Sequence, residues 1–210
     1  MTISLTARDA LIVVDIQYDF LPGGSLAVTG GDEIIEPVNA MAKRFANVVL
    51  TQDWHPADHL SFASNHDGAK PYETIELPYG VQILWPDHCI IGTKGAEFSV
   101  RLDIPHSQLV IRKGFRPTVD SYSAFQEADR RTKTGLAGYL RERNLERLFI
   151  AGLATDFCVA WSALDAVAAG FETYVIDDAT RAIDTNGSLA AAWADMDAAG
   201  VKRGRISDVL

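Results

Sequence analysis

RLFIAGLATDFCV, residues 147–159, joins a short apolar run to a turn that contains Cys158, one of only two cysteines in the chain. The run over 147–154 is continuous and apolar, which is typical of a strand buried on both faces of a sheet. After it, residues 157–170 carry apolar side chains at helical spacing and end at Gly170, where a C-terminal helix cap belongs. The stretch predicts a buried strand followed directly by a helix, with Cys158 in its first turn.

Further apolar runs of the same kind, alternating with helical patterns, extend over most of the chain. The other predicted strands are 10–16, 47–53, 108–114 and 173–179. The other predicted helices are 32–46, 133–144 and 187–199. This alternation predicts βαβ units with right-handed crossovers. We therefore predict an α/β fold of three α/β/α layers around a central, mostly parallel, Rossmann-like sheet.

Length and charge limit the classes of protein to consider. The 210 residues suffice for one well-buried domain and are too few for a second, so we predict a single domain over 1–210. A formal net charge of −9 argues against a nucleic-acid partner, because phosphate binding relies on clustered Lys and Arg. No apolar run approaches the length that spans a bilayer, and no basic region precedes a long apolar segment at the N-terminus. We expect a cytoplasmic protein without a membrane partner, with Cys89 and Cys158 as free thiols.

Residues 54–105 interrupt the alternation with a long segment that has little helix or strand periodicity. The segment is rich in Pro, Gly, His and aromatic residues. Loops of this length are usually functional or disordered, and the Trp, Tyr and His content argues against disorder. We predict an ordered functional loop here, with a metal-binding region at about 53–105.

Polar side chains stand where the predicted strands end, and open parallel sheets bind ligands at those ends. Asp15, Lys113 and Cys158 are three of them. Each alone has an ordinary interpretation: a turn residue, a solvated surface charge, a small buried hydrophobe. Together they favour a covalent amidase, in which Lys113 and the helix end lower the pKa of Cys158 while Asp15 carries the proton. Backbone N–H groups of the turn before Cys158 would receive the oxyanion.

A second group of polar residues has the composition of a metal site. Asp53 and His55 are two residues apart, so in an extended strand end they project to the same side, and His88 could complete the set. This mixed N/O set suits zinc, iron or manganese without choosing among them. The alternative is that these histidines only form hydrogen bonds within an ordered loop. Clustering weakens that alternative, since four of the five histidines lie between 55 and 88, whereas His106 stands apart.

Several motifs in order along the chain carry a family resemblance. The chain resembles the nicotinamidases (pyrazinamidases) of the isochorismatase-like cysteine hydrolase superfamily, over essentially its whole length. The motifs that match are VVDIQYDF, TQDWHPADHLSFAS, WPDHC, RKGFRPTVDSYSAF and GLATDFCVAWSALDA. The resemblance implies a catalytic triad of Asp15, Lys113 and Cys158, an oxyanion hole from the N–H groups of Ala154 and Cys158, and a cis peptide bond between Leu153 and Ala154.

The same resemblance implies a cofactor and a substrate. One divalent metal ion, zinc first with iron or manganese as alternatives, would be held by Asp53, His55 and His88, with the pyridine nitrogen of the substrate as a further ligand. The side chains expected around the ring are Phe20, Trp85 and Tyr122. The implied reaction is hydrolysis of nicotinamide, and also of pyrazinamide, through a Cys158 thioester, with nicotinate and ammonia as products of nicotinamide and a role in NAD salvage. A homo-oligomer is a further expectation.

Two departures from the family pattern and three rival functions accompany this resemblance. The role of His59 stays open because some relatives use a fourth protein ligand near it, and residue 157 is Phe where many relatives have His or Tyr.

A metal-free amidase acting on carbamoyl or ureido compounds is disfavoured by the metal motif, and an isochorismatase proper is disfavoured by Cys158. A binding protein that senses metal or redox state through its thiol is the rival outside the enzymes.

Overall fold

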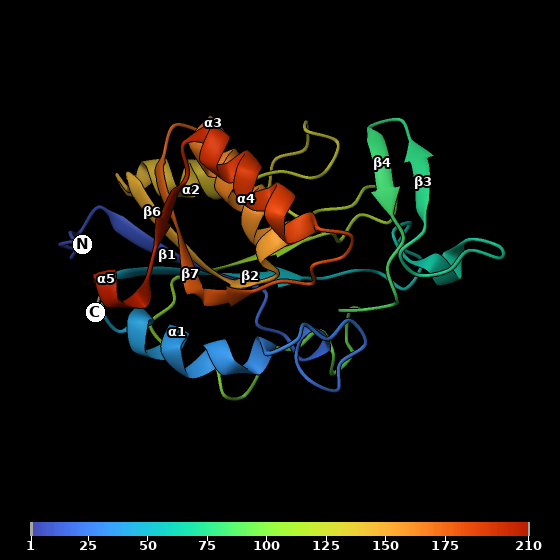
Figure 1. Ribbon diagram of the computed structural model, residues 1–210, viewed down its shortest axis with the longest axis horizontal. Helices are drawn as coiled ribbons and strands as arrows, with labels where there is room; N and C mark the ends of the chain where they lie inside the picture. Colours follow the sequence, from blue (N-terminus) through green and yellow to red (C-terminus); the bar gives the residue numbers. More distant parts are fainter. Residues whose placement is uncertain (1, 210) are drawn as a thin grey trace.

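The computed structural model describes residues 2–209 and has a parallel sheet at its centre (Figure 1). Six strands lie in the order β5-β2-β1-β6-β7-β8, and every neighbouring pair is parallel. The strands are β1 (Asp9–Val14), β2 (Asn47–Asp53), β5 (Leu109–Lys113), β6 (Arg147–Leu153), β7 (Glu172–Arg181) and β8 (Lys202–Gly204). All five predicted strands are present within a few residues of their predicted ends, and β8 is an addition.

Helices cover both faces of this sheet, as Figure 1 shows. α1 (Ile35–Ala42) and α5 (Ile206–Val209) pack on one face, and α2 (Leu136–Glu142), α3 (Ala160–Ala168) and α4 (Ser188–Ala199) pack on the other. Successive residues of a strand point to opposite faces, so Leu11 and Val13 of β1 join the first core while Ala10 and Ile12 join the second. The predicted three-layer α/β/α fold is confirmed.

The long segment between β2 and β5 differs from its prediction in one respect. It contains a two-stranded antiparallel hairpin of β3 (Thr74–Leu77) and β4 (Gly80–Ile83), which stands apart from the main sheet in Figure 1. Gln82 is the one buried residue among the eight strand positions. Because the hairpin buries so little, its sequence lacks the apolar alternation by which a strand is recognised. A short 3₁₀ turn, Ala63–Asn65, lies in the same segment.

The predicted helix boundaries shifted at three places. The helix predicted over 133–144 is shorter, since α2 begins at Leu136 and ends at Glu142. The pattern over 32–46 divides into a 3₁₀ turn, Gly31–Ile34, and α1. The helix predicted from 157 begins with a π-helical turn, Thr155–Val159, before α3. Within residues 2–209, none of the helices combines the length and the apolar character needed to cross a membrane.

The strand order places a topological switch point between β1 and β6. From β1 the chain adds β2 and β5 on one side, and from β6 it adds β7 and β8 on the other. The two central strands meet closely at their ends: Gly152 has φ +121°, and a Cβ there would lie 2.1 Å from the Val14 carbonyl oxygen. Ligands of such sheets bind at the carboxyl ends beside the switch point, which is where Asp15 and Cys158 follow β1 and β6.

Candidate active site and metal centre

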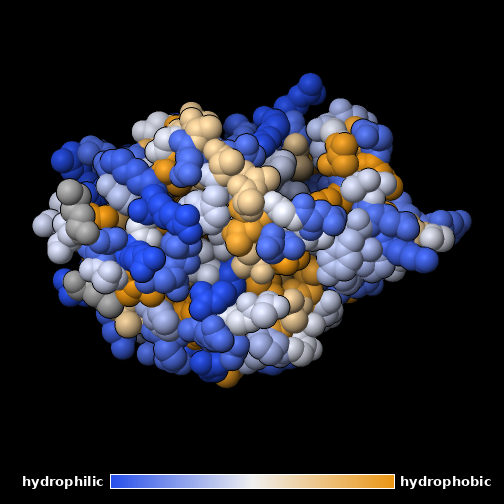
Figure 2. All heavy atoms as spheres, in the orientation of Figure 1, coloured by the Kyte–Doolittle hydropathy of each residue, from blue (hydrophilic) through white to orange (hydrophobic). Residues whose placement is uncertain are grey.

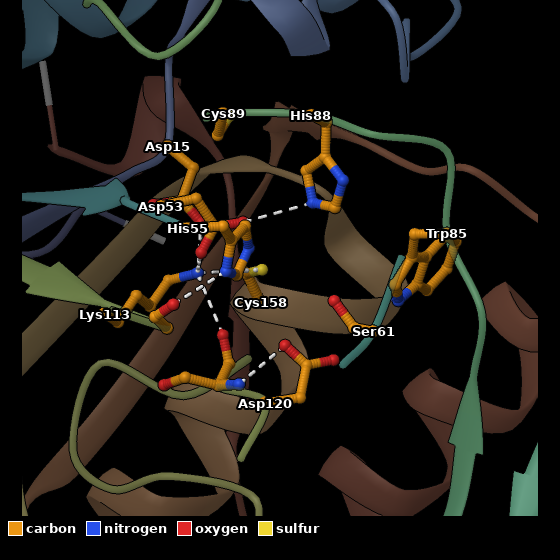
Figure 3. Close-up of polar contacts among 12 residues, drawn as sticks. Asp15, Asp53, His55, Ser61, Trp85, His88, Cys89, Lys113, Asp120 and Cys158 are labelled. Carbon is orange, nitrogen blue, oxygen red and sulfur yellow. Dashed lines mark hydrogen bonds and ion pairs between the residues drawn. The ribbon is translucent and has the colours of Figure 1, made fainter. Parts of the chain in front are cut away.

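The three predicted catalytic side chains meet at this end of the sheet (Figure 3). Lys113 Nζ lies 2.8 Å from Asp15 Oδ2 and 3.3 Å from Cys158 Sγ. The second carboxylate oxygen of Asp15 accepts a 2.6 Å hydrogen bond from the Thr51 hydroxyl. Asp15 and Lys113 are fully buried and Cys158 is 6% exposed. The structure thus brings together a carboxylate, an ammonium and a thiol that are 45 to 143 residues apart in pairs along the chain.

Lys113 carries a charge that two carboxylates share. Its Nζ also donates to Asp53 Oδ1, and to the Ser121 carbonyl at 3.3 Å. Burial alone would lower the pKa of Lys113, but Asp15 and Asp53 raise it well above its ordinary value, so the side chain is an ammonium. For Asp15 the effect of burial is larger than that of Lys113, and its pKa is raised. A carboxylate with a raised pKa is a better proton acceptor than an ordinary aspartate.

The electrostatics of Cys158 correct one expectation from the sequence. Burial raises the pKa of the Cys158 thiol well above its ordinary value, and the opposing effect of Lys113 is smaller. The nearby Asp15 and Asp53 carboxylates raise it further. The cation and the helix end favour the thiolate, as predicted, but burial and the two anions outweigh them. The resting thiol is therefore protonated, and its proton must go to a neighbour before the sulfur can attack.

The turn that presents Cys158 is closed by its own backbone. The Leu153–Ala154 peptide bond is cis, as the resemblance implied. The N–H groups of Phe157 and Val159 both donate to the Ala154 carbonyl, at 3.2 and 3.1 Å. These bonds wrap the π-helical turn around Cys158, and π-helical turns are often found at functional sites.

Asp156 fixes this turn to the segment that follows β7. Its carboxylate accepts hydrogen bonds from the backbone N–H groups of Ile183 and Asp184, at 3.1 and 2.8 Å, and from the Ser188 hydroxyl. Asp156 is 5% exposed, so these bonds are shielded from water. Ile183 in turn lines the pocket above Cys158. Nothing in the sequence alone distinguished Asp156 from an ordinary helix-cap residue.

The three predicted metal ligands also meet, on the other side of Asp53. The Nε2 atoms of His55 and His88 lie 3.6 and 3.8 Å from Asp53 Oδ2, and one ligand atom from each residue falls within 4.8 Å of the others. His55 Nδ1 lies 2.8 Å from the Gly114 carbonyl and His88 Nδ1 lies 2.8 Å from the Pro86 carbonyl. A carbonyl only accepts, so both Nδ1 atoms carry the proton and a neutral ring keeps its lone pair on Nε2. The donor set therefore fits a divalent cation.

The charges of Asp53 and His88 agree with a cation site. Burial would raise the pKa of Asp53, but Lys113 and His55 lower it strongly, so the carboxylate is ionised. Burial together with His55 lowers the pKa of His88 to about 4, which leaves its ring neutral at neutral pH. Burial acts to lower the pKa of His55 too, yet the Asp53 carboxylate raises it. The Asp53 carboxylate thus favours positive charge on its histidine side.

His59 lies beside this group, with both of its ring nitrogens engaged elsewhere. The Ser61 N–H lies 3.3 Å from His59 Nδ1, and the Ser61 hydroxyl lies 2.7 Å from the same atom. An N–H can only donate, so Nδ1 accepts and the proton sits on Nε2, 3.2 Å from the Val119 carbonyl. In this arrangement His59 offers no free lone pair to a cation.

A small pocket of about 20 Å³ lies over the thiol and the metal ligands. The three aromatic residues named from the resemblance all line it: Phe20, Trp85 and Tyr122. Further residues line the pocket although no place in it was predicted for them: Leu26, Asp120, Ser121, Phe157 and Ile183. Asp120, Ser121 and Phe157 belong to motifs that carried the resemblance, which is the signal that could have found them. Leu26 and Ile183 gave no signal in the sequence.

Comparisons with known proteins agree with this site. The isochorismatase domain model matches residues 9–205. A nicotinamidase of Acinetobacter baylyi is 60% identical, covering 92% of this chain and 91% of that protein. A solved Acinetobacter baumanii nicotinamidase/pyrazinamidase superposes with a TM-score of 0.97 at 57% identity, over 99% of this chain and 100% of that chain. The pyrazinamidase of Pyrococcus horikoshii, solved in complex with zinc, has a TM-score of 0.78 at 37% identity, over 94% and 99% of the two chains.

These matches span nearly the whole length of the chain and of the relatives, and they agree with the order of the motifs and with the strand order of the sheet. Identity of this degree over this length is far above what a shared fold alone produces. The chain belongs to the isochorismatase family, within its group of nicotinamidases.

Proposed function

We propose that this protein is a nicotinamidase, which hydrolyses nicotinamide to nicotinate and ammonia and also accepts pyrazinamide. The observation that carries the proposal is the position of Asp53. One of its carboxylate oxygens contacts Lys113 beside the thiol, and the other faces the two histidines. A nucleophile and a cation site therefore open into one aromatic-walled pocket, which suits a flat ring with a carboxamide on one edge and a nitrogen on another.

In the acylation half of the reaction, Asp15 takes the proton of the Cys158 thiol and the sulfur attacks the carboxamide carbon. The positive charge of Lys113 stabilises the thiolate as it forms. The N–H groups of Ala154 and Cys158 receive the oxyanion of the tetrahedral intermediate. Asp15 then returns its proton to the nitrogen, the C–N bond breaks, and ammonia leaves a thioester on Cys158.

In the second half, water attacks the thioester carbon and gives its proton to Asp15. The C–S bond breaks, nicotinate is released, and the proton held on Asp15 returns to the sulfur. One water is consumed for each amide, and the thiol and carboxylate end in their starting states. The released acid is the form that would return to NAD synthesis.

Asp53 Oδ2, His55 Nε2 and His88 Nε2 are the atoms that would hold the metal ion. When bound, a divalent ion supplies a positive charge at which a ring nitrogen can be held; zinc is our first choice, and iron or manganese would suit the same donors. Asp53 then orients the Lys113 ammonium and the metal ligands with a single carboxylate. Phe20, Trp85 and Tyr122 would pack around the ring and hold its carboxamide within reach of the thiol.

We also propose that the protein is located in the cytoplasm. Cys89 and Cys158 are both free, which suits the reducing cytoplasm. We also keep a homo-oligomer as a prediction, to be measured by light scattering.

The test is ammonia release from a panel of amides, with and without a chelator. Nicotinamide and pyrazinamide should react only in the metal-loaded protein, and carbamoyl or ureido compounds should not react. Fast hydrolysis of the ureido compounds without metal would instead identify a metal-free amidase. Metal binding with no ammonia from any amide would favour a sensor.

A further inference from the structure

A second hollow lies directly behind the wall of the active-site pocket. It measures about 310 Å³ and lies between the hairpin and the start of α4, with Tyr72 and Ile83 on the first side and Ser188 and Ala191 on the second. Figure 2 shows apolar surface on this face over the hairpin and beside α4. Phe157 lines both this outer hollow and the pocket above Cys158. Its ring is the partition between them.

The inner pocket is narrow in comparison with the outer hollow. Its volume of about 20 Å³ is a small fraction of the 310 Å³ of the outer hollow by the same measure. A large substituent on a bound ring therefore finds room only in the outer hollow.

Among residues 2–209, Phe157 is the one residue that lines both hollows, and its ring is held less firmly than its aromatic neighbours. Trp85 Nε1 donates to the Tyr122 hydroxyl at 2.9 Å, and Gln82 donates to the same hydroxyl at 3.3 Å, so these two rings hold each other in place. Phe157 has no polar atom in its side chain and meets Trp85 and Tyr122 only by ring contacts, with centroids 4.9 and 5.7 Å apart. The outer hollow lies on the far side of this ring.

A bound substrate would turn one particular edge of its ring toward Phe157. This part of the inference rests on the proposed function. If the ring nitrogen is held at His55 and His88 and the carboxamide carbon lies at Cys158, the ring carbon between these two points faces Lys113. The opposite carbon, C5 of the pyridine ring, then faces away from Lys113. In Figure 3, Trp85 lies on that opposite side, with the histidines and Cys158 between it and Lys113. Phe157 packs edge-on against Trp85 there.

We propose that Phe157 determines which rings the enzyme accepts, and that the outer hollow is a subsite for substituents at C5 of pyridine-3-carboxamides. With phenylalanine at 157 the inner pocket takes an unsubstituted ring and excludes a large C5 substituent. With a small residue at 157 the two hollows join, and a C5 substituent extends past the wall toward Tyr72 and Ala191.

The experiment compares kcat/KM for nicotinamide and for 5-phenylnicotinamide in the metal-loaded parent and in Phe157→Ala. The parent should react with nicotinamide and barely with the 5-phenyl compound. In Phe157→Ala the ratio of the 5-phenyl value to the nicotinamide value should rise by about tenfold or more, as expected when a pocket gains a ring-sized space. Adding Ala191→Trp to Phe157→Ala fills the outer hollow and should bring the ratio back down.

A matched control and a binding measurement separate size selection from general damage. Phe115→Ala removes a ring that is 45% exposed and lines neither hollow, so its ratio should equal that of the parent. The acid product 5-phenylnicotinate should bind Phe157→Ala more tightly than the parent, measured by the change in tryptophan fluorescence. Phe157→Leu should give an intermediate ratio, and it decides the question if Phe157→Ala fails to fold.

The outcomes of the two proposals are distinct. A parent protein that does not hydrolyse nicotinamide contradicts the proposed function. A parent that hydrolyses nicotinamide and the 5-phenyl compound equally well contradicts the role of Phe157, and so does a folded Phe157 variant with an unchanged ratio. A raised ratio that Ala191→Trp does not reduce shows that the substituent lies elsewhere and overturns the outer subsite.

Discussion

Lys113 and Asp53 are register partners at the ends of neighbouring parallel strands, and the Lys113 ammonium donates to the Asp53 carboxylate. The pairing makes one buried carboxylate serve two neighbours, because its other oxygen faces His55 and His88. Removing the Lys113 charge would leave the Asp15 and Asp53 carboxylates buried without their shared cation, which is costly. Asp53 thus stands between the ammonium beside the thiol and the two histidines.

The nucleophile is the first residue to test. Cys158→Ala should reduce ammonia release by about 10⁴-fold or more, because alanine cannot form the thioester. The fold should persist, as seen by circular dichroism. Cys89→Ala is the matched control and should keep most of the activity. Mass spectrometry after iodoacetamide treatment should find the label on Cys158; inactivation with the label on Cys89 alone would reverse the assignment.

The charges beside Cys158 should shift its alkylation profile in opposite directions. The buried thiol has a raised pKa, so in chelated protein its alkylation should begin at a higher pH than that of a free cysteine. Lys113→Ala removes a cation that favours the thiolate, and it should move the onset upward by about one pH unit or more. Asp15→Asn removes an anion that disfavours the thiolate, and it should move the onset downward while abolishing turnover. If alkylation of Cys158 begins at the same pH in the two variants, Lys113 does not favour the thiolate and Asp15 does not disfavour it.

Metal removal should separate substrate binding from thiol chemistry. Chelator treatment or His55→Ala should abolish nicotinamide hydrolysis, because the ring nitrogen loses the charge that holds it. Iodoacetamide should still alkylate Cys158 at a similar rate. Benzamide, which has no ring nitrogen, should be a poor substrate of the loaded enzyme. If the metal-free protein keeps its full rate, or benzamide equals nicotinamide, then the ring nitrogen does not select the substrate.

Gly114 offers a test of the metal site that touches no ligand. It has φ +70°, and a Cβ there would lie 2.3 Å from His55 Cε1 and 2.6 Å from His55 Nδ1. Gly114→Ala should displace the His55 ring and lower the metal content measured by mass spectrometry. Gly68→Ala is its control: Gly68 has φ +74° with open space around it. Both carry a similar backbone strain of about 1–2 kcal/mol, so a loss of metal confined to Gly114→Ala isolates the contact with His55.

His59 should prove dispensable for the metal. Its Nδ1 accepts from the Ser61 N–H and its Nε2 proton faces the Val119 carbonyl, so His59→Gln should retain one metal per chain. His88→Ala, by comparison, should lose it. A His59→Gln protein that binds metal as poorly as His88→Ala would make His59 a fourth ligand.

The central strands could be predicted because each is apolar on both faces, a pattern that a surface strand does not show. The β3–β4 hairpin escaped prediction for the opposite reason, since its side chains are mostly exposed. The meeting of Asp15, Lys113 and Cys158 followed from their place at strand ends. Their distances depend on the strand order β5-β2-β1-β6, which no local pattern encodes.

The finer features of the site depend on contacts between distant backbone groups. The proton positions on His55 and His88 are set by the carbonyls of Gly114 and Pro86, and the sequence gives no sign of either contact. Burial beside two carboxylates raises the pKa of Cys158, whereas the cation and the helix end, which the sequence does show, predicted a lower pKa.

The hydrogen bonds of the Asp156 carboxylate tie the turn around the thiol to the segment after β7, so the two should open together as one unit. The amide hydrogens of Ile183 and Asp184 are held by that carboxylate, so they can exchange with solvent deuterium only when the unit opens. Their exchange rates report the order of the nucleophile's surroundings without any label on the sulfur. Slower exchange at these two amides on addition of the acid product would reveal a site that tightens around its ligand, even in a variant that cannot turn over.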